Sequence, residues 1–334
     1  MATGVLGGVE SGLRPFNPMG DMGPVADLIE VAFGVDLGPE GREAVRGMRA
    51  AAYGGPLLWI LGDLFSGYVW VEEKRVVGNV TLSRSRGGYL VSNLAVHPDY
   101  RRRGIARRLM EAVIDAVEER RAPWVALEVR RDNRAAKGLY EKLGFVRVDA
   151  QTEMRLAETV ALVLREGPSV RELEPTEWRE GYRLWKEALP KETAFLGTRE
   201  GSKPDLGEGL LAWLWDLLGR RRYRWVAGGS MLTLRLSWAG PHRLEMVVQG
   251  EERGRVEEGL LAKAFSILPT HPPRGAVARI YPSYLETIRV LERCGFIEER
   301  TLERMILRVK GGKNGYSRGE DADPEDDRGG TDHR

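Results

Sequence analysis

Apolar residues recur every three or four positions in two segments of the first half of the chain, a spacing typical of amphipathic helices. The first segment predicts a helix over residues 105–120, whose apolar stripe consists of Ile105, Leu109, Val113 and Val117. The second predicts a helix over 134–143, whose stripe consists of Ala135, Ala136, Leu139 and Leu143. Gly144 follows directly, at the position where a left-handed glycine commonly ends a helix.

Shorter apolar segments bounded by turn residues predict the strands of a sheet. The expected order from Leu13 is a short strand, helices at 25–33 and 40–52, a hairpin of strands 68–71 and 76–83, a strand at 89–96, the helix at 105–120, a strand at 124–129, the helix at 134–143 and a strand from Phe145. Strands and helices mixed in this order indicate an α/β or α+β fold.

The second half of the chain repeats the first. Residues 139–145 correspond to residues 290–296 at an offset of 151, and Arg103-Gly104 corresponds to Arg253-Gly254 at an offset of 150. An apolar helix follows the glycine in both copies. Two further segments resemble the opening of the first half, namely 178–188 and 223–237. We therefore expect two copies of one domain.

The boundary between the copies is expected near Gly167-Pro168, which gives domains at 13–166 and 167–309. The Gly-rich first segment, 1–12, is expected to be flexible. The last segment, 310–334, contains almost no apolar residue, so it cannot repay its ordering entropy and is expected to be disordered.

Composition narrows the class of protein. The 334 residues are 42% hydrophobic and 30% charged, as in an ordinary globular protein of about two domains. A net charge of +2 gives no reason to expect a nucleic-acid partner. Cys294 is the single cysteine and the four histidines lack paired spacing, so no metal site is expected. No signal peptide and no membrane-length apolar run is seen, so we expect a cytoplasmic protein without a membrane partner.

A basic loop between a strand and a helix is the candidate for chemistry. The strand ends at Val96, Pro98 stops it, and three arginines lead through Gly104 into the helix. The first amides of a helix lack intrahelical acceptors, and with the helix dipole they suit a pyrophosphate. Gly104 and the small Ala106 let phosphates approach the backbone. The alternative is an ordinary turn with a solvated basic loop.

The surroundings of this loop favour the binding interpretation. Strands are predicted on both sides of the loop and its helix. In the next helix Asn133, Ala136 and Tyr140 stand at spacings that place them on one face.

These residues resemble the GNAT superfamily of N-acetyltransferases. The pattern Q/R-x-x-G-x-G/A of that family is matched by 101–106, with Ala106 in the last position. The stretch 127–145 is similar to the second motif of the family, and its residues are similar to those of the ribosomal-protein alanine N-acetyltransferases. The match covers about 60 residues, and the rest of the first domain agrees only in element order. The resemblance implies two tandem GNAT-like domains, each with a mixed, mostly antiparallel sheet flanked by helices.

The resemblance also implies acetyl-CoA as co-substrate and a place for it. Strand residues pair through their backbone with the pantetheine arm, the loop holds the pyrophosphate, and helix residues contact the cofactor. The cofactor-binding residues implied in this way are Leu94, Ala95, Val96, Arg101, Arg102, Arg103, Gly104, Ile105, Ala106, Arg107, Asn133, Ala136 and Tyr140.

Two residues are implied as catalytic. Tyr140 matches the tyrosine that protonates the leaving thiolate, and a phenol with a pKa of about 10 keeps its proton at neutral pH. Glu128 matches the glutamate that deprotonates the attacking amine. The alternatives are a packed aromatic for Tyr140 and a salt-bridge partner of nearby arginines for Glu128, those arginines being Arg130, Arg131 and Arg134.

The second copy has lost this set of residues. The replacements are Arg101 by Glu251, Glu128 by Arg279, Asn133 by Tyr284 and Tyr140 by Leu291. We predict a degenerate domain that binds no acetyl-CoA and either walls the acceptor site or stabilises the first domain.

The sequence thus predicts an enzyme that moves an acetyl group from acetyl-CoA to a primary amine by direct attack. The acceptor is a protein N-terminus or a small molecule, and a homodimer is left open. A non-catalytic acyl-CoA-binding sensor or assembly module is the alternative. An RNA-binding role for the basic, aromatic run 220–225 is a weaker one, because such a run is more often a solvated turn.

Overall fold

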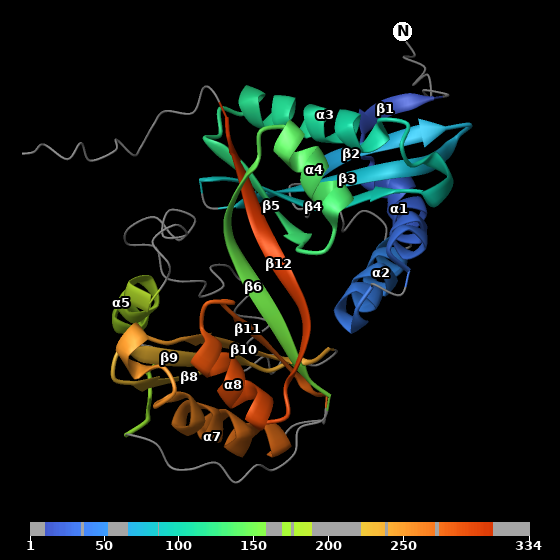
Figure 1. The fold of residues 1–334 in the computed structure, drawn as a ribbon. Coiled ribbons are helices and arrows are strands. Elements are labelled where there is room, and N and C mark those ends of the chain that lie inside the picture. Colours follow the sequence, from blue (N-terminus) through green and yellow to red (C-terminus); the bar gives the residue numbers. More distant parts are fainter. Residues whose placement is uncertain are drawn as a thin grey trace, which may run out of the picture.

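The computed structural model describes residues 11–34, 37–52, 66–85, 87–157, 169–174, 177–188, 222–237, 240–270 and 274–309. Within these ranges the chain forms a single sheet of 12 strands with helices on both faces (Figure 1). None of the helices in these ranges is long and apolar enough to span a bilayer.

The first half contains the elements β1 (Gly12–Pro15), α1 (Pro18–Phe33), α2 (Pro39–Ala52), β2 (Ser66–Glu72), β3 (Arg75–Ser85), β4 (Gly88–Val96), the short 3-10 helix η3 (Pro98–Tyr100), α3 (Ile105–Glu119), β5 (Trp124–Arg130), α4 (Arg134–Lys142) and β6 (Val146–Leu156). These follow the predicted order. The difference is largest at α1, which begins at Pro18 and not at Val25. Asn17 caps it by accepting from the amide of Met19, and proline is favoured in the first turn.

The second half contains β7 (Arg171–Glu172), α5 (Trp178–Ala188), β8 (Arg222–Ala227), β9 (Ser230–Arg235), β10 (His242–Val247), the 3-10 helix η6 (Gly250–Glu252), α7 (Glu257–Ile267), the 3-10 helix η7 (Leu268–Thr270), β11 (Ala276–Ile280), α8 (Leu285–Arg293) and β12 (Ile297–Arg308). The repeat is visible in the backbone. Gly144 after α4 and Gly295 after α8 both adopt left-handed conformations, with φ of 88° and 85°.

The two halves exchange their last strands. The sheet order is β1-β2-β3-β4-β5-β12-β6-β11-β10-β9-β8-β7. β12, from the end of the chain, pairs antiparallel with β5 of the first half, and β6 pairs antiparallel with β11 of the second. β6 and β12 also pair with each other and form the long twisted ribbon that joins the two ends of the molecule in Figure 1. Neither half completes its sheet alone.

The mixed, mostly antiparallel sheet expected from the sequence is confirmed. The parallel pairs are β4 with β5 and β10 with β11, which occupy equivalent places in the two halves. The predicted domain limits 13–166 and 167–309 stay a prediction, since the boundary and the tail lie outside the described residues, as do residues 1–10. Of the run 220–225, residues 220 and 221 lie outside the described residues, and 222–225 belong to β8.

Side chains of β5 alternate between two environments. Val125, Leu127 and Val129 belong to the core under α3 and α4. Glu128 lies on the opposite face of the strand, toward the side covered by α1 and α2, because neighbouring residues of a strand face opposite ways. The α3–α4 face and the α1–α2 face of the first half are therefore chemically distinct.

Candidate active site

A gap opens between β4 and β5 in the first half. The two strands pair only from Tyr89–Val91 on β4 to Val125–Leu127 on β5. Beyond Val91, β4 continues to Val96 while pairing only with β3 among the described strands. The predicted cofactor-binding residues Leu94, Ala95 and Val96 lie on this stretch, whose side toward β5 has no described strand beside it.

A buried asparagine that the sequence analysis did not single out holds this stretch in place. Asn93 adopts a left-handed conformation, with φ of 54°, where the β3–β4 register shifts. Asn79 of β3 is 1% exposed and donates its Nδ2 hydrogen to the carbonyl oxygen of Asn93, at 3.0 Å. A polar residue in the middle of the apolar run 76–83 is the sequence signal that was available.

The loop before α3 presents backbone amides to an anion. Arg102 and Gly104 both have positive φ, 65° and 79°, and Gly104 caps the helix without a side-chain bond. The amide of Arg108 makes the first bond of the helix, to the carbonyl oxygen of Gly104. The amides from Arg102 to Arg107 have no hydrogen-bond acceptor in the part of the chain that the structure describes. Unpaired amides and the helix dipole together fit a pyrophosphate.

Arg101 points away from this amide cluster. Its guanidinium donates to the carbonyl oxygen of Val96, at 3.3 Å, and to that of Ala32 at the end of α1, at 2.9 Å. It therefore ties the loop to α1. In this geometry Arg101 supports the loop, and its place in the cofactor-binding set stays a prediction.

The other loop arginines differ in how firmly they are held. Arg103 donates to the carbonyl oxygen of Asp99 and lies 4.8 Å from the ring centre of Tyr100. Arg107 pairs with Glu111 one helical turn on, at 2.8 Å. Among the described residues, Arg102 has no side-chain partner, which leaves its guanidinium available to a phosphate.

Helix α4 carries the three remaining predicted residues. Asn133 is the N-cap, and its Oδ1 accepts from the amide of Ala136 at 3.1 Å. Tyr140 is 6% exposed and packs beside Phe145, with ring centres 5.9 Å apart. Burial raises the pKa of Tyr140 to about 12. The phenol is therefore a hydrogen-bond donor at any physiological pH.

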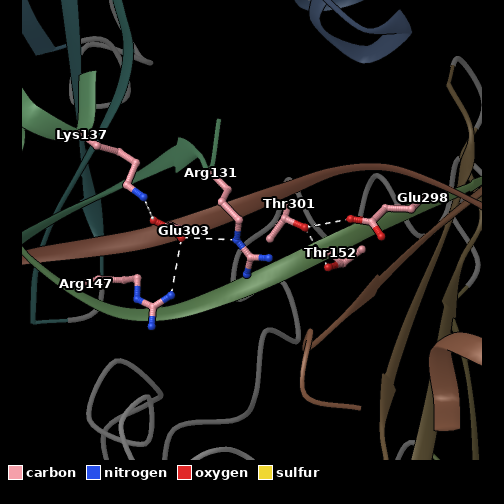
Figure 2. Close-up of polar contacts among 7 residues, drawn as sticks. All are labelled: Arg131, Lys137, Arg147, Thr152, Glu298, Thr301 and Glu303. Atoms are coloured by element: carbon pink, nitrogen blue, oxygen red, sulfur yellow. Dashed lines mark hydrogen bonds and ion pairs between the residues drawn. The ribbon is translucent and has the colours of Figure 1, made fainter. Parts of the chain in front are cut away.

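The exchanged strand anchors α4 through a buried glutamate, Glu303 of β12, whose side chain is 4% exposed. Its cationic partners are Lys137 of α4 at 2.6 Å, Arg131 at 3.3 Å and Arg147 at 3.5 Å (Figure 2). Burial opposes ionisation of Glu303, but the hydrogen bond and charge of Lys137 and the two guanidiniums outweigh it and lower the pKa. The helix with Tyr140 is thus held by a residue from the far end of the chain, which sequence reasoning missed.

Glu128 has a salt-bridge partner that the sequence analysis did not name. Its carboxylate accepts from Arg304 of β12 at 3.0 Å, and the side chain is 37% exposed. Two of the arginines proposed as alternative partners pair with other residues. Arg130 pairs with Asp132, and Arg131 pairs with Glu303. The partner was unpredictable because it comes from the exchanged strand.

Glu128 and Tyr140 lie on opposite faces of the sheet at β5. Tyr140 belongs to the core under α3 and α4, and Glu128 faces the α1–α2 side. The gap between β4 and β5 separates them. A molecule in this gap would have the side of the sheet with the Glu128 carboxylate on one face and the side with the Tyr140 phenol on the other.

The equivalent loop of the second half shows that one predicted correspondence is wrong by two residues. Arg253 follows η6 as Arg101 follows η3, and its Nε donates to the carbonyl oxygen of Val248 at 3.4 Å, as Arg101 does to Val96. Gly254, with φ of 81°, comes next, in the place of Arg102. Arg101 therefore corresponds to Arg253 and not to Glu251. The shared Arg-Gly pair misled the alignment because the two glycines occupy different places in the loop.

The second loop contains its own anion. Glu257, the first residue of α7, is fully buried. Its Oε1 accepts from the amide of Gly254 at 2.9 Å and from the hydroxyl of Thr287 at 2.7 Å. Tyr284 caps α8 where Asn133 caps α4, and the guanidinium of Arg253 lies 3.7 Å from its ring centre. A carboxylate of the chain thus occupies the region where the first loop leaves its amides unpaired.

Known proteins resemble this chain in sequence and in shape. Residues 43–145 match the model of the acetyltransferase (GNAT) family. A stretch of 53 residues, 16% of the chain, is 53% identical to the ribosomal protein bS18-alanine N-acetyltransferase of Escherichia coli (strain K12) and covers 36% of that protein. The matching stretch thus spans about a third of the length of the curated relatives.

Two solved structures share the whole arrangement. One is a GCN5-related N-acetyltransferase from Sphaerobacter thermophilus, with a TM-score of 0.63 and 19% identity over 91% of this chain and 97% of that one. The other is the tandem GNAT protein from the clavulanic acid biosynthesis pathway, with a TM-score of 0.59 and 17% identity over 90% and 99%. At such identities the likeness concerns the fold alone. The sequence of residues 43–145 is thus similar to the GNAT acetyltransferase family, and the fold is shared with a tandem GNAT protein.

Proposed function

We propose that the first half, completed by β12, is an N-acetyltransferase that moves an acetyl group from acetyl-CoA to a primary amine by direct attack. The observation that carries this proposal is the row of amides from Arg102 to Arg107 without acceptors among the described residues, at the mouth of the gap between β4 and β5. The family match over 43–145 supports it.

The residues of the loop and of β4 fit a CoA thioester. The amides of the loop and the guanidinium of Arg102 would hold the diphosphate, and the backbone of Leu94 and Val96 would pair with the amide groups of the arm. The bound molecule supplies an activated acyl group. A backbone N–H of β4 in the gap is also placed to stabilise the oxyanion that develops on the carbonyl oxygen.

Glu128 is proposed as the group that takes the proton of the amine. An α-amine with a pKa of about 7.8 is already partly neutral near pH 7.5, so a weak base suffices for it, whereas a lysine with a pKa of about 10.4 needs stronger help. The ion pair with Arg304 fixes the position of the Glu128 carboxylate. The acceptor therefore approaches from the α1–α2 face.

Tyr140 is proposed as a hydrogen-bond donor to the departing sulfur. Full transfer of its proton to a thiolate would be uphill, because the pKa of Tyr140 is about 12 and that of a thiol is about 8.5. Donation without transfer still stabilises the developing negative charge. The thiolate then takes its final proton from solvent, to which Glu128 returns the proton that it took from the amine. This role requires the phenol and not its ionised form.

The acceptor is proposed to be an amine at a protein N-terminus or on a small molecule, and we propose the cytoplasm as the site of action. The similar protein from Escherichia coli is described as acting on an alanine of ribosomal protein bS18. The second half is proposed to bind no acetyl-CoA, since Glu257 occupies its loop and the buried Leu291 stands where Tyr140 does. It serves the first half by supplying β12.

The proposal is tested by calorimetry with acetyl-CoA and by thiol release with a panel of amines, using the full chain and Tyr140→Phe. We expect one acetyl-CoA per chain, and a kcat for Tyr140→Phe about 100-fold lower, a typical loss for one hydrogen-bond donor to developing negative charge, with acetyl-CoA affinity within about twofold of the parent. Because the pKa of Tyr140 is about 12, its ionisation should not limit kcat at any pH below about 11.

Two outcomes would overturn the proposal. Absence of acetyl-CoA binding would remove the assignment of the loop. Binding without turnover of any amine would favour the acyl-CoA sensor instead.

A further inference from the structure

Two groups of three charged side chains cross the centre of the sheet on the α1–α2 face. The first group, which we name the acidic triad, is Glu128 of β5, Arg304 of β12 and Asp149 of β6. Arg304 donates to Glu128 at 3.0 Å and to Asp149 at 3.4 Å. Burial raises the pKa of Asp149, with a further contribution from Glu128, against the charge of Arg304. Two carboxyl groups thus share one guanidinium.

The second group, the basic triad, has the opposite composition. Glu153 of β6 lies between Arg279 of β11, at 2.6 Å, and Arg300 of β12, at 2.5 Å. The Glu153 side chain is 4% exposed, whereas those of Arg279 and Arg300 are 34% and 31% exposed. The charges of the two arginines lower the pKa of Glu153 despite its burial. Two guanidiniums thus share one buried carboxylate, and both arginine side chains remain about a third exposed.

The triads are equivalent by the internal repeat, with every sign reversed. The offset of 151 that relates β5 to β11 and β6 to β12 relates Glu128 to Arg279, Glu153 to Arg304 and Asp149 to Arg300. Arg279 stands in the second half where Glu128, the proposed base, stands in the first. The charges of the other two residues of each triad are reversed as well. Each triad therefore still contains oppositely charged partners. The acidic triad has one more carboxyl group than guanidinium groups, and the basic triad has one more guanidinium than carboxyl groups.

Both triads line one cavity of about 600 Å³ beside the gap between β4 and β5. Its charged walls are Glu128 and Arg304 from the acidic triad and Arg279 and Arg300 from the basic triad. Asn93, Arg279 and Arg300 also line a second cavity of about 280 Å³, so the two cavities adjoin. One side of the second cavity is apolar and comes from α1, α2 and the segment between them, through Ile29, Phe33, Leu37, Val45 and Met48. The sheet forms the other side, with the apolar Leu244 and Val277 and the charged Glu153, Arg155, Arg243 and Glu245.

We propose that the acceptor carries a carboxylate about 10 Å from its amine, with the amine beside Glu128 and the carboxylate on Arg279 and Arg300. Arg300 and Arg304 are four residues apart on β12, about 13 Å along an extended strand, and side-chain lengths shorten the distance between ligand groups. Guanidinium pairs are well suited to bind carboxylates. This inference rests on the proposed function, whose acceptor it specifies.

The distance favours an extended peptide N-terminus over a free α-amino acid. Two extended residues span about 6.6 Å, and an acidic side chain reaches roughly 4 Å at a steep angle to the strand, so an acidic third residue places its carboxylate about 8 to 10 Å from the α-amine. The apolar cavity would receive a neighbouring side chain. Polyamine-like and aminoglycoside-like acceptors would bring further positive charge to Arg279 and Arg300 and are disfavoured.

The test measures kcat/KM of the full chain for peptides that differ at one position. The probes are Ala-Ala-Glu-Ala-amide, the same peptide with Gln or Lys in third place, 8-aminooctanoate and spermidine. We expect the Glu peptide to exceed the Gln peptide about tenfold and the Lys peptide about 100-fold, as for the gain and the reversal of one charged contact. If 8-aminooctanoate matches the Glu peptide, the chemistry is supported and the source is a small molecule.

Single-residue variants then test whether Arg279 and Arg300 cause the preference for the Glu peptide. Arg279→Gln and Arg300→Gln should reduce the Glu-to-Gln ratio from about tenfold to about twofold or less, and Arg300→Lys should retain most of it. Arg147→Gln is the matched control, because it removes an arginine from β6 that points to Glu303 on the opposite face. Melting curves for each variant show whether the fold survives the loss of a Glu153 partner.

The outcomes separate the two proposals. Equal turnover of the Glu, Gln and Lys peptides, or a preference that survives both Gln variants, overturns the acceptor inference and leaves the acetyltransferase intact. Binding of acetyl-CoA without turnover of any probe, spermidine included, overturns the proposed function and the inference with it. A preference for spermidine overturns the inference alone.

Discussion

Two loops of similar course enter α3 and α7, and they differ in what their backbone amides meet. In the first, the amides from Arg102 to Arg107 have no acceptor among the described residues. In the second, the carboxylate of Glu257 accepts from Gly254 and Thr287 within the protein. The comparison teaches that two loops of similar backbone course can differ in whether a carboxylate of the chain accepts from their amides.

Removal of β12 should have the largest effect, because it tests whether the two halves are separable at all. A chain that ends at Phe296 leaves β5 and β6 without their shared partner and removes Met305, which is 1% exposed, from the core under α3 and α4. We expect loss of the cooperative thermal transition by circular dichroism and of acetyl-CoA binding by calorimetry.

The control for this truncation is a chain that ends at residue 309, which keeps β12 and should keep both properties. Acetyl-CoA binding by the chain that ends at Phe296 would contradict the view that the exchanged strand is part of the first domain.

Glu257→Ala should have the next largest effect, and it acts on the second loop only. The amide of Gly254 and the hydroxyl of Thr287 would lose their buried acceptor, which costs about 2 to 3 kcal/mol in the free energy of unfolding. Phosphate at tens of millimolar should restore part of this loss in the variant and have less effect on the parent. Urea unfolding measures both.

Glu258→Ala is the matched control at the next position. Glu258 pairs with Arg293 on the surface, so its loss should cost under about 1 kcal/mol and should not respond to phosphate. An equal phosphate response in the two variants would argue against an anion site at α7.

The smallest effect is expected from two glycine substitutions matched in backbone angle. Gly104 and Gly254 have φ of 79° and 81°, so alanine should cost about 1 kcal/mol of stability at either position. Only Gly104→Ala should weaken acetyl-CoA binding, by about tenfold, because its new methyl group would face the phosphates. No atom lies within 4 Å of that methyl position in the free protein.

Calorimetry with acetyl-CoA checks this pair. If Gly254→Ala weakens acetyl-CoA as much as Gly104→Ala does, the second loop takes part in binding and the comparison between the loops fails.

The sequence predicted local structure well because the signals are local. The apolar stripe from Ile105 to Val117 and the glycine after each repeat helix determine the type and the end of these elements, and α3 and α4 begin and end within a residue of expectation. The predicted helix 25–33 is shorter than α1, which begins at Pro18. The prediction followed the apolar periodicity, which begins at Val25, and did not use the helix-start signal of Asn17-Pro18.

Strand exchange could not be predicted from the same signals. β12 alternates apolar and polar residues in the same way whether it pairs with β5 or with β11, so periodicity carries no information about its partner. The partner of Glu128 and the anchor of α4 followed from that pairing and were missed for the same reason. A fold repeated twice in one chain offers two self-consistent pairings.

The charge reversal, in contrast, was present in the sequence. A comparison of residues 149 and 153 with residues 300 and 304 at the offset of 151 shows acids replaced by arginines at both positions. That these side chains contact one another could not be predicted from the sequence, because it depends on the register of β5, β12, β6 and β11. The catalytic and cofactor-binding roles of the predicted residues remain predictions.

The placement of β12 also sets an order on synthesis. About 140 residues separate the end of β6 from the start of β12, so at 5 to 20 residues per second the ribosome needs roughly 7 to 30 s to deliver the strand that closes the first sheet. During that interval β5 and β6 present open edges of the kind that pair with other chains. The nascent first half is therefore a natural client for chaperones, and its sheet is complete only after residues 297–308 have been translated.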